Sequence, residues 1–347
     1  MNYIRRLLDD ASLKTVLSGR SVVDYPNMNF ENIDECNAFL ECYGYHALDD
    51  AEEVEAIRQE ALVLLRSVIL NNNVKLPKRL VEVTDMTQFL FWASSTKKSA
   101  IALWSCSLLR IMHTLVHCHS FFNEHYHRSI REQIISKIQS HIVRNETGIF
   151  LGDIKLSDFQ TRPLKTRQSV AIKLLHKAEN ISADIFDWIG VRFITSYRFD
   201  ALRVLTYLRK KNIIMFANVK PSRSRNSLCD VSWLKKRWDE GDLNDIRDSF
   251  EDSEFPKSDG IPAANIHSNS NYRSIQFTCR QRIKINQNNF QPLRFFFPFE
   301  VQITDRKSYL ENKMGESSHI AYKKRQLIAV RKRVLGVLYD KYGSIEE

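Results

Sequence analysis

Two carboxylates that lie far apart in the sequence stand beside short apolar segments. Asp187 precedes the segment 189–195 (IGVRFIT), and Glu300 lies within 299–305 (FEVQITD). Counting by twos from Glu300 reaches Gln302, so both polar side chains share one face of the predicted strand. Carboxylates at strand ends can hold Mg²⁺, which takes oxygen ligands and completes its shell with substrate phosphates.

Cations and an aromatic residue add to this chemistry. Lys165, Arg167 and Lys173 lie in or before a predicted helix at 168–178, where they can neutralise a polyphosphate. Tyr272 offers a flat face on which a nucleobase can stack. Taken singly, each residue also has a structural explanation, such as a helix cap, a solvated basic helix or a half-buried tyrosine. The ordered set is what favours a nucleotide site.

A cluster of histidines around Cys118 is a second candidate. Its members are His113, His117, His119, His125 and His127. His113 and His117 are spaced i, i+4 on a predicted helix, which is a spacing that zinc ligands use. The glutamate of the hydrolytic zinc motif is missing between them, the pattern fixes no third ligand, and the sequence has no His-Asp doublet. We therefore expect these histidines to be structural.

Composition indicates a basic globular protein. The chain has 347 residues, 43% of them hydrophobic, which is enough for two domains, and its net charge of +10 favours an anionic partner such as a nucleotide or RNA. Residues 1–25 lack the apolar core of a signal peptide, and the apolar helical stretch 101–116 is too short to span a membrane. The six cysteines form no CxxC pair, which favours reduced thiols and a cytoplasmic location.

The elements that must position these residues fall into two halves. Residues 1–148 are predicted to form a helical domain with 101–116 as its central buried helix, and residues 149–347 to form a domain that alternates helices and strands. Its predicted helices are 168–178, 198–211 and 319–341, and its predicted strands are 189–195, 213–220, 272–280 and 293–304. Residues 221–262 are polar and are predicted to be a long loop or insertion.

The order of the motifs over about residues 150–330 resembles the synthetase domain of RelA/SpoT-type alarmone synthetases. The matching residues are, in chain order, Lys165 and Ser169; Asp187, Gly190 and Arg192; Tyr272, Arg273, Ser274 and Ile275; Glu300 and Gln302; and His319, Tyr322 and Lys323. That family transfers a pyrophosphoryl group from ATP to the ribose 3′-hydroxyl of GDP or GTP. The resemblance implies an α+β fold, with a nucleotidyltransferase-like mixed β-sheet flanked by helices and preceded by the all-helical N-terminal region.

The resemblance also implies roles for individual residues. Asp187 would bind Mg²⁺, and Glu300 would be the second metal ligand or the base that accepts the hydroxyl proton. Gln302 would be a further catalytic residue, and Tyr272 would stack on the acceptor base. The other implied substrate-binding residues are Arg162, near the adenine; Lys165, Arg167, Ser169 and Lys173, near the donor phosphates; and Arg192, Arg273, His319 and Lys323.

The implied function is an Mg²⁺-dependent pyrophosphokinase with ATP and a guanine nucleotide as partners. Two alternatives stay open: the same chemistry on the 3′ end of tRNA, and a non-catalytic nucleotide or RNA sensor on a degenerate synthetase fold. The chain departs from the family pattern on the acceptor side, where Ser270 and Asn271 precede Tyr272 in place of Asn-Gly, and Gln276 replaces the closing histidine. These departures concern the identity of the acceptor more than the metal centre.

Overall fold

The computed structural model of the protein describes most of the chain. The described residues are 17, 19, 21–24, 28–46, 49–70, 74–95, 97, 99–118, 121–163, 165–176, 185–241, 246–256, 272–287, 290–314 and 319–343. The chain divides into two compact units, each assembled from separate stretches. The first unit comprises Met1–His119, Thr166–Asp184 and Lys324–Glu347, and the second comprises Ser120–Lys165 and Ile185–Lys323. The boundary at residue 148 that the sequence predicts falls within the second unit.

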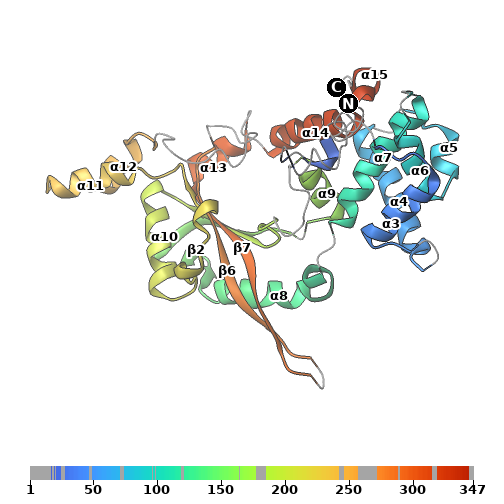
Figure 1. Ribbon diagram of the computed structural model, residues 1–347. Helices are drawn as coiled ribbons and strands as arrows, with labels where there is room; N and C mark the ends of the chain where they lie inside the picture. The colour runs from blue at the N-terminus through green and yellow to red at the C-terminus, as the bar shows by residue number, and fades with distance from the viewer. Residues whose placement is uncertain are drawn as a thin grey trace. The chain divides into compact units, whose positions relative to one another are not determined.

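The first unit is helical in its described part. Its elements are η1 (Val22–Asp24), α3 (Ile33–Tyr43), α4 (Ala51–Leu64), η2 (Leu65–Ile69), α5 (Lys78–Glu82), α6 (Met86–Ala93), α7 (Ala100–Val116), α9 (Arg167–Leu175), most of α14 (His319–Leu335), η7 (Gly336–Leu338) and α15 (Tyr339–Tyr342) (Figure 1). The hydroxyl of Ser99 caps α7 by accepting from Ala102 N at 3.3 Å. Helix α7 buries Trp104, Leu108 and Ile111, which confirms the predicted central helix.

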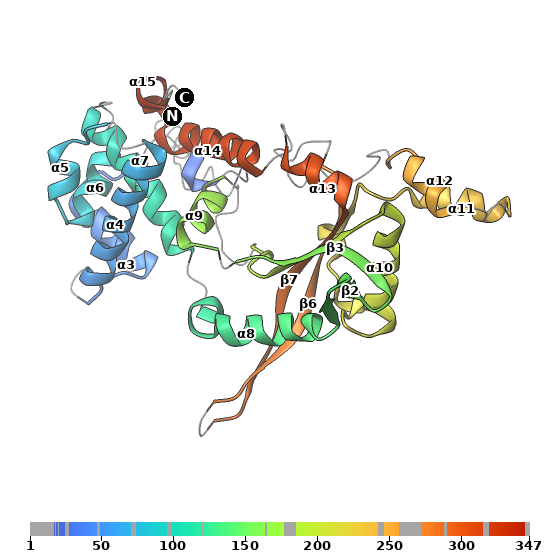
Figure 2. The same ribbon diagram turned by 180° about the vertical axis from the view of Figure 1, so that it is seen from behind.

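The second unit is built on one mixed sheet. The described strands are β1 (Ile142–Asn145), β2 (Gly148–Leu151), β3 (Ile154–Thr161), β4 (Gly190–Thr195), β5 (Arg225–Asn226), β6 (Ile275–Ile285) and β7 (Leu293–Asp305). They form a seven-stranded sheet in the order β1-β2-β3-β4-β7-β6-β5, in which the pair β4 and β7 is parallel. Helix α8 (Phe121–Gln139) packs against β6, and helices α10 (Arg198–Lys210) and α13 (Arg306–Lys313) pack against β4 and β7 (Figure 2). The mixed sheet flanked by helices confirms the expected α+β fold.

Strands β1 to β3 were not predicted from the sequence. Ile142 continues the spacing of Ile134 and Ile138, so it suggests one long helix, but α8 ends at Gln139 and Ile142 begins β1. Gly148 makes this possible, because its φ of 138° lets the chain turn back into β2. None of the described helices has the length and apolar character needed to cross a membrane.

The predicted strand at 213–220 is wrong. The segment instead contains a short helix, η4 (Phe216–Asn218), and a single bridge from Val219 to Cys279. Asn212, with a φ of 51°, turns the chain as α10 ends, and the N–H of Ile213 bonds back to the carbonyl of Leu208 at 3.0 Å. The apolar residues at the start of the segment therefore fill the core beside α10 without pairing as a strand.

The polar segment 221–262 is not wholly a loop. Its described part contains η5 (Pro221–Arg223), β5, α11 (Val231–Asp239) and α12 (Ile246–Asp252). Asp230 begins α11 by accepting from Ser232 N at 2.9 Å. Both helices expose several charged residues, and the one fully buried ring on them is Phe250 of α12, so their average composition resembles that of a loop.

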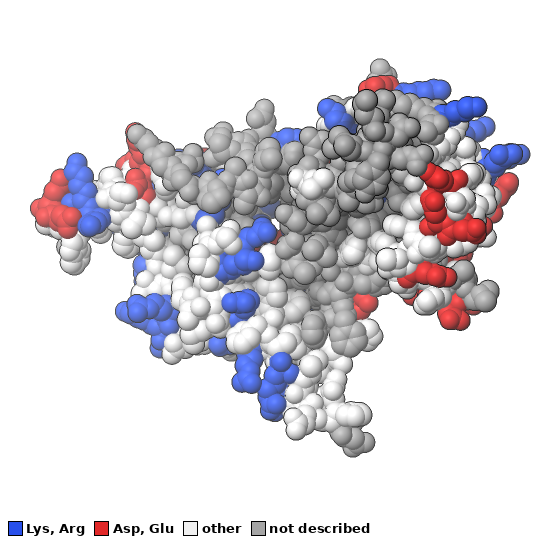
Figure 3. All heavy atoms as spheres, viewed as in Figure 1, with Lys and Arg blue, Asp and Glu red and all other residues white. Residues whose placement is uncertain are grey.

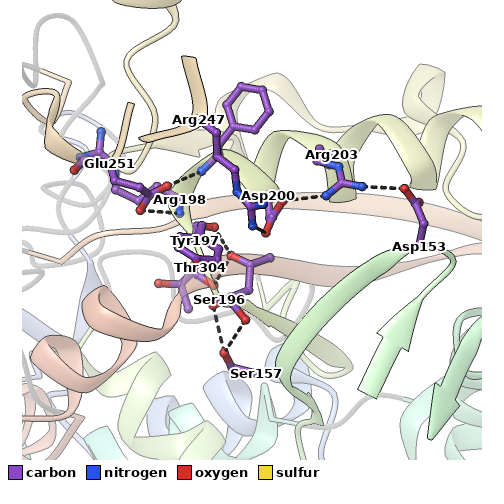
Figure 4. A network of polar contacts seen from close by, with 12 residues as sticks. Asp153, Ser157, Ser196, Tyr197, Arg198, Asp200, Arg203, Arg247, Glu251 and Thr304 are labelled. Atoms are coloured by element: carbon purple, nitrogen blue, oxygen red, sulfur yellow. Dashed lines mark hydrogen bonds and ion pairs between the residues drawn. The ribbon is translucent and has the colours of Figure 1, made fainter. Parts of the chain in front are cut away.

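Figure 4 shows how α12 is fixed to α10. The carboxylate of Glu251 accepts from the backbone N–H groups of Arg198 at 3.0 Å and Phe199 at 3.1 Å, which are free donors at the start of α10. Arg203 and Arg247 pair with the buried Asp200 at 3.0 Å and 2.9 Å. These contacts hold the end of β4 and the start of α10 in place.

Candidate active site

The register between β4 and β7 places the predicted polar residues side by side. Gly190 lies opposite Glu300, and Arg192 lies opposite Gln302. On the other edge of β7, Gln276 of β6 also lies opposite Gln302. Because paired residues project to the same face of a sheet, these side chains form one polar row. Both faces of β7 are buried here, with Glu300 only 7% exposed and Gln302 only 2%.

Gln302 connects three of the predicted site residues. Its carbonyl oxygen accepts from Arg192 Nε at 2.7 Å and from an Arg162 terminal nitrogen at 3.4 Å. Its amide nitrogen donates to the hydroxyl of Tyr272 at 2.6 Å. A buried amide with its donor and acceptor groups engaged is rigid, so Gln302 fixes the positions of both arginines and the tyrosine.

Asp187 and Glu300 meet at the guanidinium of Arg162. The Nη1 atom of Arg162 forms an ion pair with Glu300 Oε2 and lies 3.8 Å from Asp187 Oδ2. The same oxygen of Asp187 forms an ion pair with Lys165. The two carboxylates therefore belong to one site, with two predicted cations between and beside them.

The electrostatics of this site keep Arg162 charged. Burial works against the charge, but Glu300 and Asp187 outweigh it and raise the pKa of Arg162 above its ordinary value. Glu300 Oε1 accepts a hydrogen bond from the amide of Gln276. Glu300 Oε2 is the oxygen that contacts the guanidinium of Arg162, so both carboxylate oxygens of this buried acid are engaged by neighbouring side chains.

These acids fit a magnesium ion that arrives with a substrate. Mg²⁺ is commonly held by one or two carboxylates together with substrate phosphates. Glu300 Oε2 and Asp187 Oδ2 are anionic oxygens that both face the Nη1 atom of Arg162. The described residues contain no group of three or more acids, histidines or cysteines that could bind a metal. The site is therefore suited to an ion whose other ligands come from a nucleotide or from water.

Two further cations, Lys220 and Arg223, lie over the ring of Phe186. Lys220 Nζ lies 3.9 Å from the ring centroid of Phe186, and the guanidinium carbon of Arg223 lies 5.1 Å from it. Phe186 directly precedes Asp187 in the chain.

Three of the predicted donor-phosphate residues lie in the first unit. Arg167 Nε donates to Glu60 at 2.8 Å, and its guanidinium also donates to the carbonyl of Leu115. Ser169 takes part in the cap of α9, where its N–H donates to Thr166 at 3.2 Å. Lys173 lies on the same helix. Their predicted role toward a nucleotide stays a prediction.

Arg273 has its described contacts away from the polar row. The guanidinium of Arg273 lies over the ring of Phe255 at 4.6 Å, and its backbone carbonyl accepts from Asn312 at 2.9 Å. Lys323 is exposed on α14. The side chain of His319, at the start of that helix, lies outside the described residues.

Gln160 and Tyr309 extend the polar row and were missed by the sequence reasoning. Arg192 donates to Gln160 Oε1 at 3.4 Å, and Gln160 donates to the hydroxyl of Tyr309 at 2.9 Å. The guanidinium of Arg192 also lies 5.5 Å from the ring centroid of Tyr309. Gln160 lies on β3, which was not predicted, so no strand alternation was available to place it on this face.

The histidine pair of α7 lies in the first unit and bonds to a tyrosine. His113 Nδ1 is 2.8 Å and His117 Nε2 is 3.4 Å from the hydroxyl of Tyr43. Burial, with a smaller contribution from His117, lowers the pKa of His113 to about 4. Both rings have defined structural partners, in agreement with the expected structural role.

Comparisons with known proteins give matches among solved structures. No protein-family model and no curated protein matches the chain. A GTP pyrophosphokinase family protein from Streptococcus pneumoniae is 15% identical over 65% of this chain and 91% of that one, with a TM-score of 0.29. Small alarmone synthetase 1 from Bacillus subtilis is 12% identical over 62% and 88%, with a TM-score of 0.32. These are proteins of the kind that the motifs resemble, at TM-scores too low to add to what the site itself indicates.

Proposed function

We propose that this protein is an ATP-dependent pyrophosphokinase that acts on the 3′-hydroxyl of a guanine nucleotide. The observation that carries the proposal is the meeting of Asp187 and Glu300 at the guanidinium of Arg162. Both acids belong to the motif set that resembles alarmone synthetases. An acid pair surrounded by cations, with Glu300 buried and Asp187 partly exposed, suits a reaction that brings polyphosphate and a divalent ion together.

The reaction forms a bond between the acceptor 3′-oxygen and the β-phosphorus of ATP, and it breaks the bond between that phosphorus and the oxygen bridging to the α-phosphate, so AMP leaves. Glu300 would be the base that receives the hydroxyl proton once the guanidinium of Arg162 has left its Oε2 atom. Lys165 and Arg162 would move from the carboxylates onto the donor phosphates as these enter. Lys220 and Arg223 would add positive charge from the side of Phe186.

Asp187 and Glu300 would hold the magnesium ion. When bound, this ion would neutralise charge on the phosphates and help to align them. Tyr272 would stack on the acceptor base, held in place by the bond from Gln302 to its hydroxyl. Arg192, fixed by Gln302 and Gln160, would keep positive charge next to the reacting groups.

Transfer of label from ATP tests the proposal directly. The purified full chain is incubated with Mg²⁺ and γ-labelled ATP, and with GDP, GTP or tRNA in separate reactions. The expected result is label on GDP or GTP together with an equal amount of AMP. If label appeared on tRNA alone, the acceptor would be tRNA and not a guanine nucleotide. Label on none of the three would overturn the proposal.

Matched variants separate loss of chemistry from loss of fold. Asp187→Asn and Glu300→Gln keep the shape of each side chain and remove its charge, and each should lower the rate at least about a hundredfold. Glu254→Gln changes an exposed acid of the same unit and should keep the wild-type rate. Thermal unfolding of each variant shows whether it is folded. Unchanged transfer by folded Asp187→Asn and Glu300→Gln proteins would exclude these acids from the reaction.

A further inference from the structure

Strands β6 and β7 extend beyond the rest of the sheet as a two-stranded ribbon, here defined as Arg280–Ile285 and Leu293–Pro298. These segments pair with each other throughout. Within the described sheet, β7 meets β4 only from Glu300 onward, and β6 meets β5 only at Ile275 and Gln276. Figures 1 and 2 both show the ribbon projecting from the body of the second unit.

One face of the ribbon is covered by α8. Ile283 is buried, and Gln281 donates to the carbonyl of Gln133 on α8 at 3.0 Å. Gln133 in turn donates to the backbone carbonyl of Lys284 at 2.9 Å. An isolated pair of strands is marginally stable in water, so this contact supplies the packing that the ribbon needs.

The other face of the ribbon is exposed and basic. Strand alternation places Arg280, Arg282 and Lys284 on it, and the cross-strand partners of the last two are Phe296 and Arg294. All four cations are exposed, and Phe296 is 54% exposed. In the described part of the chain, no acid forms an ion pair with any of these four cations.

The sequence around the ribbon has the same bias. Between Gly260 and Phe299 the chain contains no Asp or Glu. Figure 3 shows Lys and Arg side chains gathered over this part of the molecule without acidic atoms among them. Lys284 and Arg294 are directly opposite each other across the two strands, an arrangement in which like charges destabilise a sheet. A bound polyanion would remove that repulsion.

We propose that the exposed face of the ribbon binds single-stranded RNA. The cations are spaced along two extended strands, which suits a chain of phosphates, and the exposed Phe296 between them offers a surface on which an unpaired base can stack. A second aromatic ring, Phe290, is 77% exposed near the end of the ribbon. An anionic membrane would use the cations without a need for stacking on Phe296. The RNA surface is independent of the transfer reaction, because binding to it requires neither ATP nor the two acids of the site.

Binding of a fluorescent single-stranded RNA tests the proposal. The anisotropy of an unstructured oligonucleotide of mixed sequence is measured with the full chain at several salt concentrations, without ATP or Mg²⁺. Lys284→Gln with Arg294→Gln removes two cations, and the slope of log K against log salt should become less steep by about 1.4. Phe296→Ala should weaken binding at least about fivefold, because a stacked base contributes roughly 1 kcal/mol or more.

A matched control removes the same charge elsewhere. Lys235→Gln with Lys236→Gln replaces two exposed cations of α11 and should leave binding and its salt slope as in the wild type. The Lys284→Gln, Arg294→Gln protein should unfold at the wild-type temperature or higher, because the like-charge pair is gone. Weaker binding in a protein of undiminished stability would assign the loss to the surface itself.

Several outcomes would overturn the proposal. These are equal binding by wild type and the ribbon variants, equal or tighter binding to duplex or single-stranded DNA of the same sequence, and binding to anionic lipid vesicles without binding to RNA. An effect of the α11 control as large as that of the ribbon variants would also overturn it, because net charge would then explain the binding.

Discussion

The side chain of Arg162 passes directly over Gly190. A Cβ atom built on Gly190 would lie 2.8 Å from Arg162 Cδ and 3.3 Å from its Cγ. The N–H of Arg162 also donates to the carbonyl of Gly190 at 2.8 Å. Gly190 lies opposite Glu300 in the register. Because Gly190 has no side chain, the side chain of Arg162 can pass over it and reach Glu300. The glycine at position 190 thus has a steric reason in this chain.

Gly190→Ala should displace Arg162 from the two acids. The added methyl group clashes with the middle of the side chain, so we expect a loss of about 1–3 kcal/mol in the free energy of unfolding. Chemical denaturation of the wild type and the variant measures this loss. The same change in an Arg162→Ala background should cost much less, because the clashing atoms are absent. An equal cost in both backgrounds would contradict the steric explanation.

Arg162→Ala should make the stability of the protein depend on Mg²⁺. Removing the guanidinium leaves the buried Glu300 without its ion-pair partner, at an expected cost of about 3 kcal/mol. Mg²⁺ at ten times its dissociation constant would then restore about 1.4 kcal/mol by binding the folded state. Thermal unfolding with and without Mg²⁺ at constant ionic strength measures the effect, which should exceed that in the wild type.

Adding Glu300→Gln to Arg162→Ala provides the control. With one acid neutralised, the response to Mg²⁺ should fall back to or below that of the wild type. If the double variant responded as strongly as Arg162→Ala, the ion would be binding elsewhere.

The stability of the first unit should fall in mild acid because of His113. The pKa of this residue in the folded chain is about 4, lowered by burial and by His117, against 6.5 in the unfolded chain. The unfolded state therefore binds more protons between these values, so the contribution is complete above pH 6.5 and is lost as the pH falls toward 4. The loss amounts to about 3 kcal/mol.

Denaturation of the wild type and His113→Gln at pH 7 and pH 4.5 measures this contribution. The variant should lose less stability between the two pH values than the wild type. His46→Gln, which replaces an exposed histidine of the same unit, should behave as the wild type does. Equal pH dependence of all three proteins would rule out His113 as the source.

Glu251→Ala should destabilise the start of α10. The Ncap residue Tyr197 makes no side-chain cap bond among the described residues, and Glu251 accepts from two N–H groups in its place. Loss of such a cap costs about 1 kcal/mol, and the docking of α12 would be lost with it. Hydrogen exchange at Arg198 and Phe199 should become faster. The exposed Glu254→Ala is the matched control and should leave these amides protected.

Much of the fold was readable from local sequence patterns. The periodic apolar residues of α7 and the alternation along β7 each depend on a contiguous stretch of chain, so propensity and period predicted them. The prediction of a strand at 213–220 was wrong because the turn at Asn212 overrides the apolar pattern that follows it. Strands β1 to β3 were missed because the turn at Gly148 overrides the apolar pattern around it. Charged helices such as α12 were taken for a loop because average composition does not show which side of a helix is buried.

Residue types and their spacing were enough to identify the side chains that could do chemistry: Asp187, Glu300, Gln302 and the cations near them. The three-dimensional fold established that β4 and β7 are parallel neighbours in the register that sets Gly190 opposite Glu300, and that Arg162 joins the two acids. It also placed α9, which carries Ser169 and two of the predicted cations, in the first unit. Strand order and register depend on contacts between residues distant in the chain, and a local pattern contains no information about which distant partner a strand will have.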